Sequence, residues 1–260
     1  MAKPEGDRAA SYLVLTVLGA VFLLYTRKRT EVGVGITQLH QLGFSIAAVS
    51  YAIGVVVATK FLFTTLRQKG VPAAVAIYFD RKIVHIAGGG VVALLIPVLF
   101  DSPLWPLAIG LALSLFTSLP HVLNKRLEWM QVPQNWNDVK FTFFWGLTIF
   151  VIWTVTGSPR LAVIPALFMS FGDGVTGIVR NVVFRRRTKH PIGNVFMLLV
   201  CVPLAVWMAS PFGSQMIWWG IGAAACATVV ERFEFPPIDD NILIAATASA
   251  VLLLGAWISL

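Results

Sequence analysis

The sequence predicts an all-α, polytopic helical membrane protein with about nine transmembrane helices. Of its 260 residues, 57% are hydrophobic and only 12% are charged, and the mean hydropathy is +0.80. Soluble domains carry about a quarter charged residues, so half of the usual polar cover is missing. About nine apolar runs reach the ~17 residues that a transmembrane helix needs. Spans of ~20 residues then occupy roughly 180 positions, which excludes a soluble enzyme and a second folded domain.

The first apolar run is expected to be a membrane anchor. The basic cluster Arg27–Arg29 follows it, and not the small-residue cleavage site of a secretory signal. The expected spans are residues 9–26, 43–66, 84–100, 104–123, 140–156, 161–183, 193–210, 214–230 and 241–259.

The loops between these spans fall into two sets, and the polar residues are concentrated in one of them. The longer loops are residues 67–82, 124–139, 185–192 and 231–240. Two membrane spans separate each of these loops from the next, so all four lie on the same side of the membrane. With the N-terminus included, that side holds all the Lys and Arg residues except Arg27, Lys28, Arg29 and Arg160. The positive-inside rule therefore places the longer loops in the cytosol, although the Arg27–Arg29 cluster opposes it. This topology and anionic lipids explain the net charge of +8, so no nucleic-acid partner is expected.

Asp173 is the most informative single residue. It lies about 8–10 residues inside the cytosolic end of its span, ~12–15 Å deep at 1.5 Å per residue. An unpaired carboxylate there costs at least ~2.5 kcal/mol, so it should face the protein interior or a wet cavity. The flanking Gly172 and Gly174 permit a helix break or a close approach of the backbone to a ligand. The alternative is an Asp that only packs between helices or relays protons.

A basic loop follows the same span and is a candidate phosphate site. Its cationic residues are Arg185, Arg186, Arg187, Lys189 and His190. Pro191 and Gly193 shape the loop, and Asn194 is expected at the N-cap of the next span. Cations together with the free N–H groups of a helix start bind phosphate. The alternative is that the arginines only anchor the helix end in the headgroup layer.

A second constellation precedes the third expected span. Arg81 and His85 are four residues apart and share one helical face, and Lys82 lies between them. His85 can donate to a phosphate or take a proton from a hydroxyl, although a structural His at a membrane boundary is a strong alternative.

The third constellation lies between residues 231 and 241 and contains four carboxylates. Asp240 or Asn241 can simply cap the last span. A single cap needs only one acidic residue, however, and Mg²⁺ binds one or two carboxylates together with phosphate oxygens. Asp239 and Asp240 are therefore candidate metal ligands.

These motifs, in this order, resemble those of the CTP-dependent lipid kinases, which include dolichol kinase, phytol kinase and the yeast-type diacylglycerol kinase. The matching elements are Arg81-Lys82-x-x-His85, Gly172-Asp173-Gly174, Lys189-x-x-x-Gly193 and residues 237–241 (PIDDN). Phosphatidate cytidylyltransferase belongs to the same broad superfamily. The resemblance covers roughly residues 78–260, so residues 1–77 are expected to be an N-terminal membrane extension of two helices. The remaining part is then a lipid-kinase-like membrane domain of about seven helices.

One loop departs from the family pattern. The family shows Lys-Ser/Thr-x-Glu-Gly-Ser/Thr where this chain has Lys189-His190-Pro191-Ile192-Gly193-Asn194. The loop glutamate is replaced by Ile192, and neither hydroxyl is present. Asn194 can still hydrogen-bond a phosphate, and His190 can act as a donor.

The resemblance implies phosphoryl transfer from a nucleoside triphosphate, CTP, to the hydroxyl of a polyprenol-type lipid alcohol, with Mg²⁺ as cofactor. The implied catalytic residues are Asp173, His85 and Lys189, and the implied metal ligands are Asp173, Asp239 and Asp240. The implied nucleotide-binding residues are Arg81, Lys82, Gly172, Gly174, Arg185, Arg186, Arg187, Lys189, His190, Gly193 and Asn194.

Three alternatives remain open on the sequence. A lipid-phosphate cytidylyltransferase would release pyrophosphate, and a transporter would use Asp173 as its coupling site. A catalytically silent relative would bind lipids or proteins without turning over nucleotide.

Overall fold

The computed structural model describes residues 36–133, 135–186, 188–235 and 238–259, and these residues form helices joined by loops. Seven of the helical spans are long and apolar enough to cross a membrane, and α11 (Ser214–Val230) is a shorter apolar helix. This confirms the all-helical, membrane-type architecture, but the expected count of nine helices is not confirmed. The first expected span, 9–26, and the cluster Arg27–Arg29 lie outside the described residues. From His40 onward the chain forms one compact unit, which contains every contact discussed below.

The helical elements follow the apolar runs of the sequence. Several of them join end to end into single spans, notably α3–η1–α4 and α7–α8–η2–α9. The elements are α2 (Ile36–Gln68), α3 (Ala73–Ile83), η1 (Val84–Gly90), α4 (Val91–Leu99), α5 (Leu104–Val122), α6 (Asn137–Thr156), α7 (Pro159–Ala162), α8 (Ile164–Leu167), η2 (Phe168–Gly172), α9 (Asp173–Phe184), α10 (Ile192–Ala209), η3 (Ser210–Phe212), α11 and α12 (Asp240–Ser259).

The largest error in the expected span boundaries lies at the start of α3; the span expected at residues 43–66 also begins earlier, at Ile36. The span predicted to begin at residue 84 begins at Ala73, directly after Pro72, so Arg81 and Lys82 lie within a helix and not in a loop. The run Asp80-Arg81-Lys82 resembles a loop in the sequence, but Asp80 and Lys82 are buried against the protein and the helix continues through them. The expected division between residues 77 and 78 falls inside this helix.

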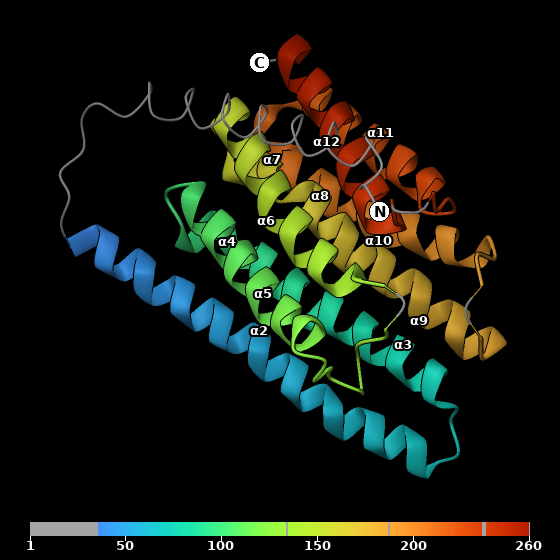
Figure 1. Cartoon of the computed structure of the whole chain (residues 1–260). Helices are drawn as coiled ribbons and strands as arrows, with labels where there is room; N and C mark the ends of the chain where they lie inside the picture. The colour runs from blue at the N-terminus through green and yellow to red at the C-terminus, as the bar shows by residue number, and fades with distance from the viewer. Residues whose placement is uncertain (1–35, 134, 187, 236–237, 260) are drawn as a thin grey trace, which may run out of the picture. The chain divides into compact units, whose positions relative to one another are not determined.

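Loops of unequal length lie at the two ends of the helices in the described unit (Figure 1). At one end the connections are residues 100–103, 157–158 and 213. At the other end they are residues 69–72, 123–136, 185–191 and 231–239. We call this second end the polar end.

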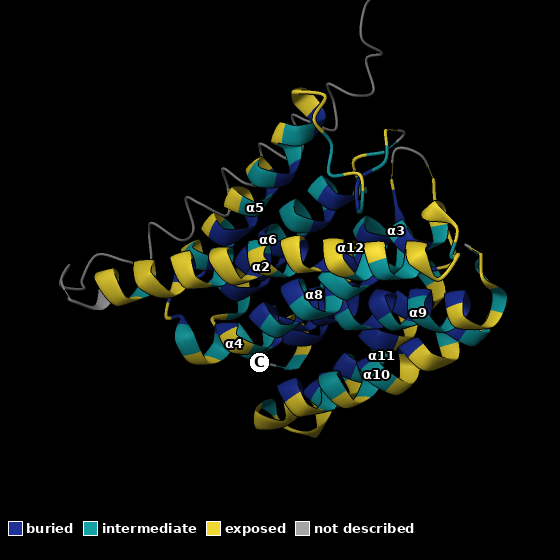
Figure 2. Cartoon of the chain, turned by 90° about the horizontal axis from the view of Figure 1, so that it is seen from below, coloured by how far each residue is buried: buried dark blue, intermediate teal, exposed yellow. Residues whose placement is uncertain are grey.

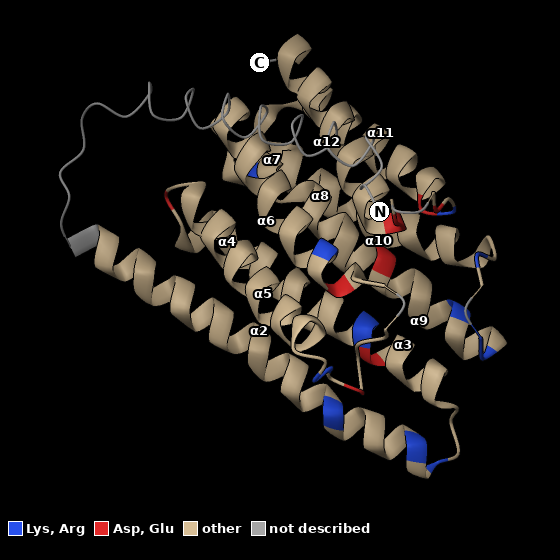
Figure 3. Cartoon of the chain, viewed as in Figure 1, with Lys and Arg blue, Asp and Glu red and all other residues tan. Residues whose placement is uncertain are grey.

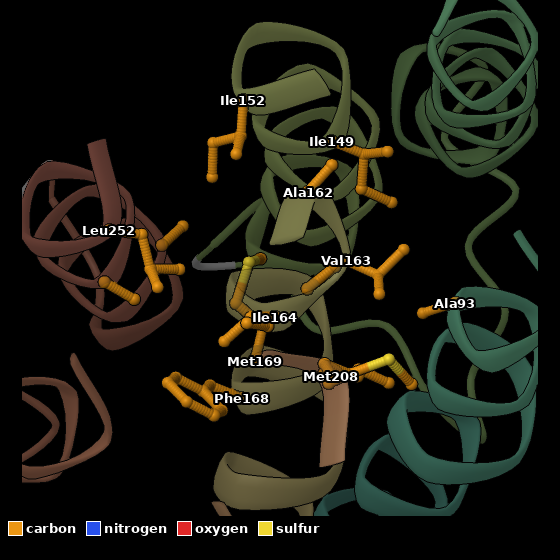
Figure 4. Packing of buried hydrophobic residues seen from close by; sticks show 14 of the residues in the cluster. Ala93, Ile149, Ile152, Ala162, Val163, Ile164, Phe168, Met169, Met208 and Leu252 are labelled. Carbon is orange, nitrogen blue, oxygen red and sulfur yellow. The ribbon is translucent and has the colours of Figure 1, made fainter. Parts of the chain in front are cut away.

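The span α7–α8–η2–α9 forms the centre of the unit. Figure 2 shows α8 in the colour of buried residues, with exposed positions on surrounding helices such as α2 and α10. Figure 4 shows Val163, Ile164 and Met169 of this span packed close to Ile149 of α6 and Leu252 of α12.

Small residues allow the helices to approach closely. A Cβ added to Gly110 of α5 would overlap the backbone of Gly146 on α6, so these two backbones are in contact. Close packing at small residues is the usual way in which helices associate in membranes. This tight frame fixes the helix ends that carry the polar residues.

Candidate functional site

Charged side chains gather at the polar end of the unit. In Figure 3 the Lys, Arg, Asp and Glu residues concentrate around α3, α9 and the loops that join α9 to α10 and α11 to α12. Buried among them are Lys82, Asp173, Arg180, Glu231 and Asp240. Charges are expensive to bury inside a membrane-type bundle unless they are paired, so their partners define the site.

Asp173 lies at the junction between the π-helical segment η2 and α9, with 1% of its surface exposed. Its Oδ2 accepts a hydrogen bond from Lys82 Nζ at 2.5 Å and lies 3.2 Å from His85 Nδ1. Within the described residues its Oδ1 has no hydrogen-bond partner, although it is buried. One oxygen is thus held by two side chains from a distant segment, while the other is buried without a partner among the described residues.

Two π-helical segments bring these residues together. His85 lies in η1 and Asp173 directly follows η2, and the two segments pack against each other. Single π-turns inside α-helices are frequent at functional sites. The imidazole of His85 stacks on the ring of Phe141, with centroids 3.8 Å apart and an interplanar angle of 7°. The ring orientation is therefore fixed from both sides, by Phe141 and by Asp173.

The Lys82 side chain reaches Asp173 over a glycine. A Cβ added to Gly177 would overlap the Cε, Cγ and Cδ atoms of Lys82. Gly177 is one turn after Asp173 on α9, so any larger residue would displace the lysine from the carboxylate. Gly174 plays a similar part between α9 and η1, since a Cβ there would meet Ile86.

Arg180 and Glu231 form a second, fully buried ion pair. The guanidinium donates from Nη1 to Oε1 at 2.7 Å and from Nη2 to Oε2 at 2.9 Å. This two-pronged geometry is the strongest form of an arginine–carboxylate pair. Arg180 also donates to the backbone oxygen of His190 and to Asn194 Oδ1, so it holds the α9–α10 loop in place.

Lys189 joins the basic loop to the acidic loop. Its ammonium lies 2.7 Å from Asp240 Oδ2, 3.0 Å from Glu231 Oε1 and 3.3 Å from Glu234 Oε1, and it also donates to the Glu231 backbone oxygen. Burial lowers the pKa of Lys189, but the carboxylates of Asp240 and Glu231 outweigh burial and raise it above its ordinary value. The residue therefore stays charged at neutral pH.

Three carboxylates meet where these ion pairs converge. Asp173, Glu231 and Asp240 each offer a ligand oxygen, and these oxygens all lie within 4.8 Å of one another. Oxygen ligands in such a group suit a hard cation such as Mg²⁺. The buried, unpartnered Oδ1 of Asp173 fits the same role.

A polar cavity of about 310 Å³ adjoins this cluster. Its cationic lining comes from Arg81, Lys82 and Arg186, and His85 and Asp240 connect it to the carboxylate group. The amide side chains that line it are Asn135, Asn137, Asn181 and Asn241. Both side-chain polar atoms of Asn181 are buried without a hydrogen-bond partner among the described residues, as is Asn241 Oδ1. The cavity thus offers cations and amides to a polar, anionic ligand.

Most of the residues singled out in the sequence lie at this site. The structure brings together Arg81, Lys82, His85, Asp173, Lys189 and Asp240. Arg186 lines the polar cavity, and Gly172 packs its backbone against Cys201 behind Asp173.

Other expected residues have different positions. Arg185 is exposed and ends α9 with a left-handed backbone (φ +52°), whereas Arg187 lies outside the described residues. His190 is exposed; its ring contacts Phe184, and its Nδ1 accepts from the Ile192 N–H. Neither Arg185 nor His190 lines the polar cavity.

The expected N-cap role of Asn194 is wrong. α10 begins at Ile192 after Pro191, so Asn194 lies within its first turn. Its amide nitrogen donates to the Thr228 backbone oxygen and to Glu231, while its oxygen accepts from Arg180. Gly193 lies beside it, where a Cβ would overlap the guanidinium of Arg180. Both residues therefore support the Arg180–Glu231 pair.

Asp239 lies outside the carboxylate group, and Glu231 occupies the third position. Asp239 Oδ1 accepts from the Ile242 N–H and so caps α12, which was the role anticipated for Asp240 or Asn241. Burial raises the pKa of Asp239 to about 6.

Glu231 and Arg180 were missed as site residues by the sequence reasoning. The sequence does contain one indication of this pair. Arg180 lies inside an apolar span, two turns after Asp173, and a buried arginine there requires an acidic partner. Glu231 directly follows the apolar run 214–230 and is the first carboxylate after it.

Comparison of this chain with protein-family models, with curated proteins and with solved structures found no match.

Proposed function

We propose that this protein is an integral-membrane kinase that transfers a phosphoryl group from a nucleoside triphosphate, CTP, to the hydroxyl of a prenol-type lipid alcohol. One observation carries the proposal. Three carboxylate oxygens within 4.8 Å of one another lie beside Lys82, Lys189 and a polar cavity, at one end of an apolar helical bundle.

The cationic lining supports binding of a polyphosphate. Phosphoryl transfer requires mainly positioning and neutralisation of charge on the phosphate oxygens. Arg81, Lys82 and Arg186 supply fixed positive charge around the polar cavity. Lys189 does not line this cavity but contacts Asp240 at its edge, and its raised pKa keeps its ammonium protonated.

The cluster of three carboxylates supports binding of a divalent cation together with the nucleotide. Asp173, Glu231 and Asp240 would hold Mg²⁺, which supplies charge neutralisation to the phosphate oxygens when bound. In this assignment Glu231 takes the place expected for Asp239.

His85 is the residue best placed to accept the proton of the lipid hydroxyl. When its Nδ1 carries the hydrogen and donates to Asp173, its Nε2 carries the lone pair. The hydroxyl oxygen then forms a bond to the terminal phosphorus while the bond from that phosphorus to the bridging oxygen breaks. The nucleoside diphosphate leaves, and the hydroxyl proton passes to Nε2.

The orientation of the protein follows from its charge. We place the polar end in the cytosol, where nucleotides are found, as the positive-inside rule favours. A Lys69→Cys variant should react with a membrane-impermeant maleimide in inside-out vesicles and not in right-side-out vesicles. The reverse labelling would overturn this orientation.

The activity is tested by incubating the purified protein, in detergent or vesicles, with Mg²⁺, γ-labelled CTP or ATP and a panel of lipid alcohols. We expect a labelled lipid phosphate and a nucleoside diphosphate. Asp173→Asn should reduce the rate by at least about 10²–10³-fold, as loss of a preorganised electrostatic group does. Asp101→Asn, at the opposite end of the bundle, is the matched control.

The products separate the proposal from its rivals. Transfer of CMP to a lipid phosphate with release of pyrophosphate would identify a cytidylyltransferase. Solute flux without nucleotide turnover would identify a transporter. Near-normal turnover in Asp173→Asn would remove Asp173 from the mechanism.

A further inference from the structure

A second cavity, lined mainly by apolar side chains, lies next to the polar one and shares two residues with it. It is bounded by α2, η1, α4, α5 and α6, and Arg81 and His85 line both cavities. The apolar residues that line it are Ala52, Val56, Val84, Val92, Leu113, Phe116, Met130, Phe141 and Trp145. His85 is thus reached from a polar space and from an apolar space.

The polarity of this second cavity changes along the helices. Asp138, Thr117 and Arg81 contribute polar groups toward the polar end. Val92 lies about two turns beyond His85 along the same span, farther from the polar end. An amphiphile with a hydroxyl and a hydrocarbon chain has the same polarity, with the hydroxyl near the headgroups and the chain in the membrane interior.

The size of the second cavity fits a chain and not a headgroup. Its volume is about 50 Å³, against about 310 Å³ for the polar cavity. A single water needs about 10–15 Å³, so this space holds a few consecutive chain carbons but no nucleotide.

One wall of the cavity is loosely attached. α2 contributes Ala52 and Val56, yet it does not approach any other helix as closely as α5 approaches α6. Side chain-to-backbone hydrogen bonds, such as Tyr51 to the Ala87 oxygen and Trp129 to the Val56 oxygen, hold it in place. Ala48 and Val49 also pack against the core, so α2 is the wall of the cavity with the fewest close backbone contacts.

We propose that the cavity between α2, η1, α5 and α6 binds the first chain carbons of the lipid alcohol, entered past α2, and presents the hydroxyl to His85. This inference rests on the proposed kinase function and gives the acceptor a site of its own. Asp138, which accepts from Gln131 at 2.6 Å and lies 3.2 Å from His121 Nε2, contributes a fixed carboxylate to the lining of that site.

The test is a pair of tryptophan variants on one helix. Leu113 lines the cavity, whereas Leu115 is 61% exposed on the outer face of α5. Leu113→Trp should raise the KM for the lipid alcohol about tenfold or more and leave the KM for nucleotide unchanged, since only acceptor binding is lost. Leu115→Trp should leave both constants unchanged. An unchanged acceptor KM in a folded, active Leu113→Trp protein would overturn the acceptor site and leave the kinase proposal intact.

Photolabelling tests the same site without activity. A lipid alcohol with a diazirine near its hydroxyl should label residues of α2, η1, α5 or α6 that line the cavity in the wild-type protein. Leu113→Ala should alter this labelling and serves as the second variant if Leu113→Trp does not fold. Labelling of this cavity in a protein that phosphorylates no alcohol would support the binding site and refute the kinase. Labelling confined to residues outside this cavity would overturn the inference.

Discussion

Arg180 and Glu231 are 51 residues apart in the chain and form a bidentate ion pair with both side chains 1% exposed. The pair joins α9 to the end of α11, and Lys189 and Asn194 contact the same glutamate. Glu231 therefore belongs both to the scaffold of the polar end and to the carboxylate group of the candidate metal site.

Arg180→Met should destabilise the protein by about 3–5 kcal/mol, because it leaves Glu231 buried without its strongest partner. Thermal unfolding in detergent measures this effect, with Arg185→Met at an exposed position as the control. The pair would not be a structural element if both variants unfolded at the wild-type temperature.

Gly177→Ala should reduce the rate of nucleotide turnover while the protein remains folded. Alanine favours a helix by up to about 1 kcal/mol over glycine, so a lower turnover rate cannot come from a weaker helix. It would come from displacement of the Lys82 side chain, which a Cβ at residue 177 would overlap. Gly54→Ala on α2, where a Cβ meets nothing within 4 Å, is the matched control. Equal rates for both variants would show that the Lys82–Asp173 contact does not matter for turnover.

Lys189→Ala should raise the KM for nucleotide, and Lys189→Arg should raise it less, since arginine retains the charge but not the geometry. The raised pKa of Lys189 also predicts that its ionisation makes no contribution to the pH profile near neutrality. Steady-state kinetics at varied nucleotide concentration and pH measure both effects. An unchanged nucleotide KM in Lys189→Ala would limit Lys189 to joining the basic loop to the acidic loop.

Asp239 should make stability dependent on pH between about 4 and 6. Burial raises its folded pKa from 3.8 to about 6, so the folded state binds the proton more tightly than the unfolded chain does. The associated stabilisation is present below about pH 4 and is lost as the pH rises through about 6, and it amounts to at most about 3 kcal/mol. Asp239→Asn retains an oxygen for the Ile242 N–H and should flatten this dependence in thermal unfolding experiments. A pH dependence equal to that of the wild type would place the pKa of Asp239 near its ordinary value.

Much of the fold could be predicted from the sequence, because apolar runs of sufficient length have few alternatives in a membrane. The run 214–230 matches α11, and 104–123 matches α5 to within one residue. The start of α3 could not be found in this way. The charges at Asp80 and Lys82 suggest a solvated loop, and only the tertiary structure shows that they are buried within a helix.

Part of the candidate site could be predicted from the sequence, because charged residues that are costly to bury in a membrane protein point to a site. Asp173 was selected by its charge and depth, and Lys189 and Asp240 by their places in a basic and an acidic loop, and the three lie together. The choice of Glu231 over Asp239 depends on how α11 ends and α12 begins, which is a matter of a single helical turn. Asn194 and His190 replace the two hydroxyl residues of a family motif and were expected to bind phosphate in their place, yet their hydrogen bonds are made to the protein itself.

The link between Arg180 and Glu231 also has a consequence for biosynthesis. The chain emerges from the ribosome N-terminus first, so Lys82 is already present when Asp173 is made, whereas Glu231 appears 51 residues after Arg180. Until Glu231 is made, the guanidinium lacks this partner, and an arginine near the end of a span can extend its stem toward the lipid headgroups. Glu231 and then Asp240, the last member of the acidic group, follow later in the chain, so the buried ion pair and the candidate cation site both form only once the C-terminal helices are present.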